Sequence, residues 1–432
     1  MRRGLVLLGA LVVAAMCDYS TAALAAPAPT VLFSFRNLRG VEPSAGLFVD
    51  HVGNLYGTTA QGGKHGVGVA FELTPPAPGK KAWSETVLFS FNGPDGAGPY
   101  GELIADGAGN LYGMTGGGGS NNVGTVFELS PPVAGQTGWS ETVLLTFNGK
   151  NGAYPWGALL ADGAGNLYGT TEEGGNNKCA SRVGCGVVFE LSPPSAGQTK
   201  WTETVLFSFH KSDGAAPLAG LIADGAGNLF GTTYEGGMTD HGLAFELSPP
   251  VAGRTAWTET VLRYFGATNG KGPSGVLLAD GAGNLYGTTN GGGKNRTGCP
   301  GDKGCGVVFE LSPPATGQTT WTETVLYVFK GTDGEVPTGG LIADGVGNIF
   351  GTAAFGGKSK ACASPLGCGL VFELSPPAAG GTPWTETLLA SFNGTKGQTP
   401  YGGLIRDGAG NLNGTTELGG THGDGVVFEV TP

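Results

Sequence analysis

The chain has 432 residues, of which 84 are glycine, and it carries a formal net charge of −11 at pH 7. Glycine at roughly three times its usual share, without the Gly-X-Y period of collagen, indicates turn-rich β structure. The acidic balance excludes nucleic acid and anionic lipid surfaces as partners, because both are themselves negatively charged.

The start of the chain has the features of a signal peptide. Two arginines precede an apolar run between Leu5 and Met16, and Ala23 begins a small-residue cleavage site. The run is too short to span a membrane and no later apolar run reaches about 18 residues, so we expect no membrane span in the mature chain. We expect residues 1–25 to be removed on export and residues 26–432 to form one domain, secreted or periplasmic.

One sequence unit repeats along the chain, and its most regular part reads Gly-Asn-Leu-Tyr-Gly-Thr-Thr. Repeats with a period of about 50 residues are typical of propellers and solenoids. The spacing between copies is nearly constant, except that three intervals are longer than the others. The seven copies begin at Gly53, Gly109, Gly165, Gly227, Gly283, Gly347 and Gly410.

Each unit predicts four short strands, because β-branched and aromatic runs alternate with turn residues. The turn between the first two strands reads Asp-Gly-Ala-Gly-Asn. Its aspartate supplies too few oxygen ligands for calcium, so we interpret it as a side-chain-to-backbone turn. In the second unit the predicted strands are Gly101–Asp106, Leu111–Thr115, Thr125–Leu129 and Glu141–Phe147.

The two ends of the chain complement each other. Thr30–Phe35 reads as a fourth strand without its first three, whereas the C-terminal segment reads as three strands without a fourth, at Leu404–Asp407, Leu412–Thr416 and Val426–Val430. One N-terminal strand can therefore complete the C-terminal sheet and leave no open edge. The sequence predicts an all-β, seven-bladed β-propeller with four antiparallel strands per blade, closed in this way.

Six cysteines of the mature chain form three pairs, each with the spacing i to i+6. Their loops are the insertions that lengthen three of the repeats. An even number of cysteines at a repeated spacing in an exported chain indicates disulfides. No histidine lies inside these loops to complete a four-ligand metal site, so we expect no metal. The predicted pairs are Cys179–Cys185, Cys299–Cys305 and Cys362–Cys368.

The repeated strings Asp-Gly-Ala-Gly-Asn-Leu-Tyr-Gly-Thr-Thr, Val-Val-Phe-Glu-Leu-Ser-Pro-Pro and Trp-Thr-Glu-Thr-Val-Leu resemble the GloVer tandem-repeat family of bacterial exported proteins. Many members carry a C-terminal anchoring tail and are called "choice-of-anchor" proteins. This sequence stops at Pro432, directly after a strand, so we expect release or periplasmic retention. The resemblance implies no catalytic residues.

The candidate binding residues lie where one blade joins the next. Each connection ends in proline just before the innermost strand, near the expected channel mouth, and aromatic residues follow that proline at Tyr100, Trp156 and Tyr401. Flat rings with a polar tip suit stacking on a sugar ring or a peptide. The simpler interpretation is that they plug the channel or pack under the loops. Six further tryptophans recur at one repeat position, before an outer strand, and indicate blade packing.

Three functions remain open from the sequence. The first is a monomeric, non-catalytic binding module without a cofactor, whose partner is a glycan or an extracellular protein. The second is a lyase or hydrolase acting on polysaccharide, which needs two carboxylates, or a histidine and a carboxylate, that converge. The third is a structural envelope protein. The candidate acids for the second are Glu172, Glu173, Asp213, Asp240, Asp333 and Glu335.

Overall fold

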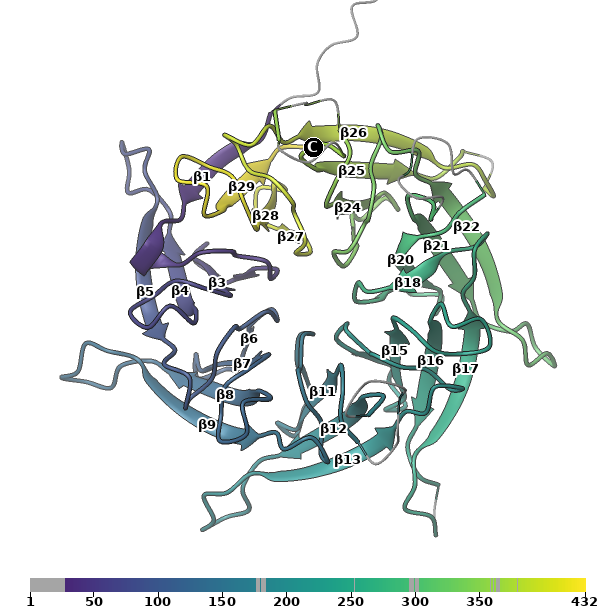
Figure 1. The fold of residues 1–432 in the computed structure, drawn as a ribbon, viewed down its shortest axis with the longest axis horizontal. Coiled ribbons are helices and arrows are strands. Elements are labelled where there is room, and N and C mark those ends of the chain that lie inside the picture. The colour runs from purple at the N-terminus through teal and green to yellow at the C-terminus, as the bar shows by residue number, and fades with distance from the viewer. Residues whose placement is uncertain are drawn as a thin grey trace, which may run out of the picture.

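The protein folds into a ring of seven antiparallel β-sheets (Figure 1). The structure is a computed structural model, and it describes residues 28–432 apart from 176–178, 180–183, 252, 295–298, 300–302, 358, 360, 363–365 and 379. The predicted signal peptide lies outside the described residues. The ring confirms the predicted seven-bladed propeller; we number the blades from the sheet that contains β2 to β5.

The innermost strand of each blade is two residues long, shorter than the predicted Gly101–Asp106. In blade 2 only Ile104 and Ala105 pair with the second strand. The chain before them packs against blade 3 instead, where a Cβ on Gly101 would lie 2.3 Å from the Gly157 carbonyl oxygen. The innermost strands are β2 (Phe48–Val49), β6 (Ile104–Ala105), β10 (Leu160–Ala161), β14 (Ile222–Ala223), β19 (Leu278–Ala279), β23 (Ile342–Ala343) and β27 (Ile405–Arg406).

The second and third strands of each blade are the most buried. The second strands are β3 (Leu55–Thr59), β7 (Leu111–Thr115), β11 (Leu167–Thr171), β15 (Leu229–Thr233), β20 (Leu285–Gly291), β24 (Ile349–Ala353) and β28 (Leu412–Thr416). The third strands are β4 (Val69–Thr74), β8 (Thr125–Ser130), β12 (Val187–Ser192), β16 (Leu243–Ser248), β21 (Val307–Ser312), β25 (Leu370–Ser375) and β29 (Val426–Val430).

The fourth strands form the outer wall of the ring, as predicted. They are β5 (Ser84–Ser90), β9 (Ser140–Thr146), β13 (Thr202–Ser208), β17 (Thr258–Tyr264), β22 (Thr322–Val328), β26 (Thr385–Ser391) and β1 (Thr30–Ser34). Two small elements were not predicted: β18 (Lys271–Pro273), which pairs with β20, and a 3₁₀ turn, η1 (Asn37–Arg39). No helix in the described part of the chain is long and apolar enough to cross a membrane.

The ring closes through the N-terminal strand. β1 pairs antiparallel with β29 and becomes the outer strand of blade 7, so the first and last strands lie side by side, purple beside yellow in Figure 1. This closure confirms the prediction from the chain ends. It also removes the free sheet edges that an open array would present.

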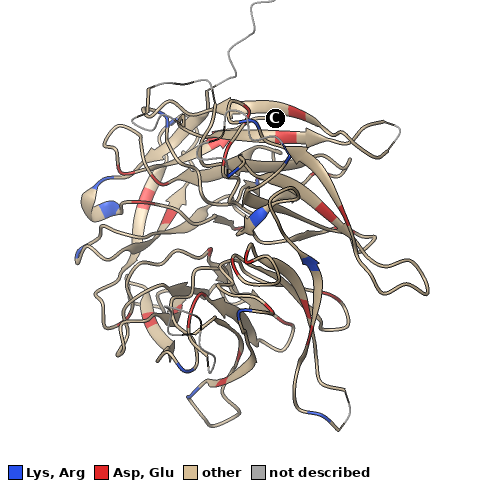
Figure 2. Cartoon of the chain, turned by 45° about the vertical axis from the view of Figure 1, so that its right-hand side comes forward, with Lys and Arg blue, Asp and Glu red and all other residues tan. Residues whose placement is uncertain are grey.

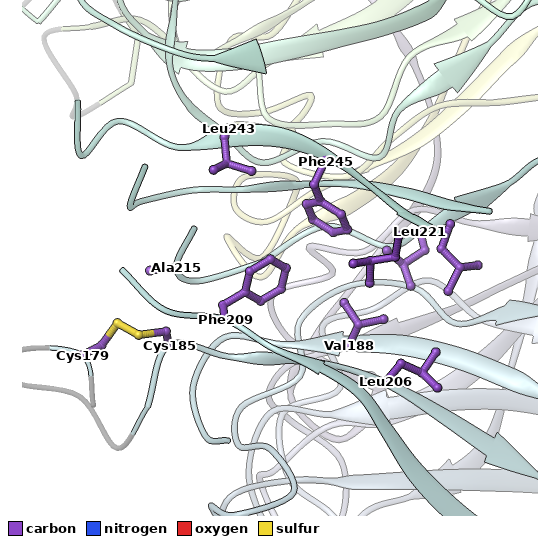
Figure 3. Packing of buried hydrophobic residues seen from close by; sticks show 11 residues of the cluster. Cys179, Cys185, Val188, Leu206, Phe209, Ala215, Leu221, Leu243 and Phe245 are labelled. Carbon is purple, nitrogen blue, oxygen red and sulfur yellow. A yellow bond between two sulfur atoms is a disulfide. The ribbon is translucent and has the colours of Figure 1, made fainter. Parts of the chain in front are cut away.

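A phenylalanine pair fills each junction between blades. One ring follows an outer strand, the other lies in the third strand of the next blade, and Figure 3 shows this for Phe209 and Phe245, 5.2 Å apart. A Cβ on Gly113 of β7 would lie 2.6 Å from the Phe127 ring, so this repeated glycine makes room for the phenylalanine. The repeated tryptophans pack against the buried hydrophobic clusters that contain these phenylalanine pairs, as predicted. They are Trp83, Trp139, Trp201, Trp257, Trp321 and Trp384.

The aspartate turns are held by local hydrogen bonds, as predicted. Asp106 accepts from the backbone N–H groups of Ala108 and Asn110, both at 2.9 Å, and from the side chains of Asn110 and Tyr112. Burial alone would raise the Asp106 pKa, but these donors outweigh it and hold the pKa below its ordinary value. The carboxylate is therefore occupied by its own turn.

Candidate functional site

The residues that follow the interblade prolines line one cavity at the centre of the ring. Its volume is about 870 Å³, and it extends along the innermost strands as far as Val49 and Arg406. All seven blades contribute to its wall, so it lies on the ring axis. The residues after the prolines are Ser44, Tyr100, Trp156, Leu218, Ser274, Thr338 and Tyr401.

An unusual backbone conformation aims these side chains at the cavity. The residue before each proline has a positive φ, which is costly for a residue other than glycine and for a β-branched one above all. Two hydrogen bonds restrain Tyr154: its N–H donates to the Val123 carbonyl at 2.9 Å, and its carbonyl accepts from Glu172 at 3.1 Å. The seven positions are Glu42, Gly98, Tyr154, Ala216, Gly272, Val336 and Thr399, with φ between 53° and 63°.

The structure brings Tyr100 and Trp156 together. Their ring centroids are 4.2 Å apart at an interplanar angle of 38°, and both side chains are partly buried. The indole N–H of Trp156 donates to Glu172 at 2.8 Å, which fixes the ring orientation. Tyr401 lines the same cavity from blade 7, and its carbonyl accepts from the Thr338 hydroxyl at 3.2 Å. The three predicted residues thus share one cavity, with two of them in contact.

Two carboxylates lie near the tyrosines. Burial raises the pKa of Tyr100, and the charges of Glu42 and Glu417 raise it further. Burial and Glu417 likewise raise the pKa of Tyr401. The pKa of Glu417 itself is raised, first by burial and then by repulsion from Glu42. Glu42 and Glu417 therefore lie close enough to the two tyrosines for their charges to act on the hydroxyl groups.

Glu102 is a lining residue that sequence reasoning missed. It is partly buried and stands two residues after Tyr100 in the cavity wall. The sequence could have indicated Glu102, because no other blade has a charged residue at this repeat position. The equivalent residues are Gly46, Ala158, Gly220, Val276, Gly340 and Gly403.

The three predicted disulfides are confirmed, with Cα–Cα distances of 5.2, 5.3 and 5.5 Å. The second cysteine of each pair also supports the cavity rim. Its carbonyl accepts a hydrogen bond from the N–H of the positive-φ residue that precedes the next interblade proline. For example, the Cys368 carbonyl accepts from the Thr399 N–H at 3.0 Å. Figure 3 shows the Cys179–Cys185 bridge beside the core cluster that contains Phe209. The inserted loops are therefore tied to the backbone that positions the cavity residues.

The candidate acids for an enzyme are dispersed. Asp333 accepts from the Lys330 N–H at 2.6 Å and from the Tyr327 hydroxyl at 2.7 Å, so it stabilises a turn. Asp213 accepts from the His210 N–H in the same way. Glu172 holds Trp156, and the backbone of Glu173 bridges to the preceding interblade loop.

Two of these acids line a second cavity of about 540 Å³ between blades 4, 5 and 6. Glu335 is only 5% exposed, and burial raises its pKa to about 7. Asp240 is exposed and forms an ion pair with Lys211 at 2.8 Å. Lys271 and His241 line the same cavity, which adjoins the first through Asn290.

These features define a seven-bladed β-propeller with an axial, aromatic-lined cavity on the face that carries the interblade loops. The chain matches the Gloeobacter/Verrucomicrobia repeat over residues 20–199 and 178–428, and it belongs to that family. This result confirms the resemblance seen in the repeated strings. No curated protein sequence matches the chain significantly.

Solved structures share the fold at low sequence identity. The extracellular domain of a putative one-component system from B. thetaiotaomicron is 11% identical with a TM-score of 0.52, over 94% of this chain. This chain covers 42% of that longer protein. A putative 6-phosphogluconolactonase from Bacteroides uniformis is 13% identical with a TM-score of 0.48, over 84% of this chain and 88% of the other. At 11% identity, the likeness to the first of these structures shows the fold alone.

Proposed function

We propose that the protein is an exported, non-catalytic carbohydrate-binding module whose ligand enters the axial cavity from the loop face. The observation that carries the proposal is the Tyr100–Trp156 pair at the cavity wall. Aromatic faces stack on the C–H faces of sugar rings, and nearby carboxylates accept hydrogen bonds from hydroxyl groups. Export agrees with three disulfides, which persist in oxidising compartments.

We favour a glycan over a protein partner because the site is a concave channel. Protein interfaces need a broad contact area of roughly 800 Å² per partner, which a narrow axial cavity does not offer. Charge also supports a neutral or cationic ligand. The chain has 23 lysines and arginines against 34 aspartates and glutamates, and Figure 2 shows both kinds spread over the described part of the ring, so the net negative charge disfavours an acidic polysaccharide.

The test is a glycan array with three proteins: wild type, Trp156→Ala and Leu218→Ala. Leu218 occupies the same repeat position in blade 4 and lines the same cavity, so it is the matched control. We expect Trp156→Ala to weaken binding about tenfold or more and Leu218→Ala to change it much less. Equal loss in both variants would refute the aromatic platform, and no glycan binding at all would refute the proposed function.

A polysaccharide-cleaving enzyme is the second candidate, and Glu335 is the observation in its favour. A buried carboxylic acid with a pKa of about 7 is suited to act as a general acid. The same array glycans should be incubated with wild type and Glu335→Gln, with release of reducing ends as the readout. Turnover that is lost in Glu335→Gln would replace the non-catalytic proposal.

A further inference from the structure

Glu102 is the one acidic residue among the described residues that line the axial cavity. It lies two residues after Tyr100, across a bend at Gly101, and just before β6. Its Oε2 atom lies against the neighbouring blade, 2.8 Å from the position that a Cβ on Gly46 would take. The carboxylate therefore occupies the space that this glycine leaves open between blades 1 and 2, in the wall of the cavity that Tyr100 and Trp156 also line.

The protein supplies no counter-charge to this carboxylate. Burial alone raises the Glu102 pKa to about 7, and no charged group or hydrogen-bond donor in the described part of the chain lowers it. Arg406 is the cation that lines the same cavity, but it is exposed, donates to the Gly410 carbonyl at 3.3 Å and lies over the Phe350 ring. A partly desolvated carboxylate without a charge partner is unfavourable for the free protein.

A cationic ligand would provide that compensation. Glu42 and Glu417 add negative potential beside the tyrosines, and the faces of Tyr and Trp rings attract cations. A metal ion is a poor fit, because calcium takes six to eight oxygen ligands and no three acids, histidines or cysteines of the described residues cluster to hold an ion. An ammonium group needs one carboxylate and tolerates an aromatic wall.

Building on the proposed carbohydrate site, we propose that its ligand is an amino sugar whose ammonium group pairs with Glu102 in the cavity that the Tyr100 and Trp156 rings also line. Stacking supplies affinity for the sugar ring, and the ion pair distinguishes a cationic amino sugar, with a protonated or quaternary nitrogen, from its uncharged N-acetylated form. Acetylation removes the charge and leaves the partly buried Glu102 carboxylate without an ionic partner, which disfavours the complex.

The test measures the dissociation constants of two hexasaccharides with the same backbone by calorimetry. One is a hexamer of N-trimethylated glucosamine, which stays cationic at about pH 8, and the other is a hexamer of N-acetylglucosamine. Glu102 with a pKa of about 7 is ionised under these conditions. We expect wild type to bind the cationic form about tenfold or more tightly than the acetylated form. Glu102→Gln should abolish this preference while keeping affinity for the acetylated form, and Glu128→Gln in β8 is the matched control.

Gly46→Ala provides a second variant that does not alter Glu102 itself. Alanine occupies the equivalent position at Ala158, and the new methyl group would push the flexible carboxylate aside. We expect it to reduce the cationic preference as well. Tryptophan-dependent binding of acetylated or neutral sugars without a cationic preference would overturn the amine assignment alone. Binding of neither hexasaccharide nor any array glycan would overturn the carbohydrate site, and the amine assignment with it.

Discussion

Phe35 and Phe71 pack edge to face across the junction where the ring closes, with their ring centroids 4.9 Å apart. Phe35 follows β1, and Phe71 lies in β4 of blade 1. The six other junctions hold equivalent pairs at 4.9 to 5.3 Å. The closing junction is therefore packed like the junctions inside the continuous chain.

Phe35→Ala should destabilise the ring as much as the same change at an internal junction. Both Phe35 and Phe147 are fully buried, and truncating such a ring removes about 3–5 kcal/mol of stability. The measurement is the free energy of unfolding in urea for Phe35→Ala and Phe147→Ala. A much smaller loss for Phe35→Ala would mean that β1 contributes little to closure.

Stability should fall as the pH rises from about 5 to about 8. Burial raises the pKa of five glutamates to about 7, against an ordinary value of 4.5: Glu85, Glu102, Glu141, Glu259 and Glu335. An acid with a higher pKa in the folded chain favours folding fully below its unfolded pKa. That contribution is lost as the pH rises through the folded pKa. Urea titrations across this range measure the slope.

Glu141→Gln should flatten that slope. Its Oε1 atom is buried without a hydrogen-bond partner, and burial followed by repulsion from Asp95 raises its pKa. The amide carries no charge to desolvate, so the variant should gain stability over wild type chiefly above pH 7. A variant that tracks wild type at every pH would show that this outer carboxylate does not contribute to the slope.

Removing one disulfide should loosen the cavity rim of the following blade. Changing both Cys362 and Cys368 to alanine opens a short loop, which lowers stability by about 2 kcal/mol in the chain-entropy account. The Cys368 carbonyl accepts from Thr399, two residues before Tyr401. We expect faster hydrogen exchange at the Thr399 amide than in wild type, with the Tyr154 amide, which has no disulfide behind it, as the internal reference. Unchanged exchange would refute the coupling.

Gly113→Ala should destabilise blade 2 by about 1–3 kcal/mol, because the new Cβ would lie 2.6 Å from the buried Phe127 ring. Gly107→Ala is the matched control, since a Cβ there would meet nothing within 4 Å. Thermal unfolding of the two variants makes the comparison. A loss of similar size in both would mean that backbone entropy, and not the contact with Phe127, explains the effect.

The repeat and the complementary chain ends predicted the blade number and the closure, because both follow from periodicity. Strand ends were less predictable. The innermost strand of blade 2 is only Ile104–Ala105, shorter than predicted, because Gly101 packs on the next blade. The sequence of a single repeat unit cannot reveal this contact between blades. Likewise β18 depends on pairing between an interblade loop and β20.

The candidate site was predictable only in part. The interblade prolines placed Tyr100, Trp156 and Tyr401 near the channel, and the structure puts all three in one cavity. Glu102 was visible as an exception to its repeat position, but its significance depends on burial and on missing partners. These are properties of the assembled ring and not of the sequence pattern.

The pairing of β1 with β29 has a consequence for how such rings evolve. Because β1 is the outer strand of the sheet that β27, β28 and β29 complete, the seam lies within blade 7 and not between two blades. Duplication or loss of one internal repeat unit would change the number of blades. β1 and β29 would still pair, so the number of blades can vary during evolution while these two closing strands stay unaltered.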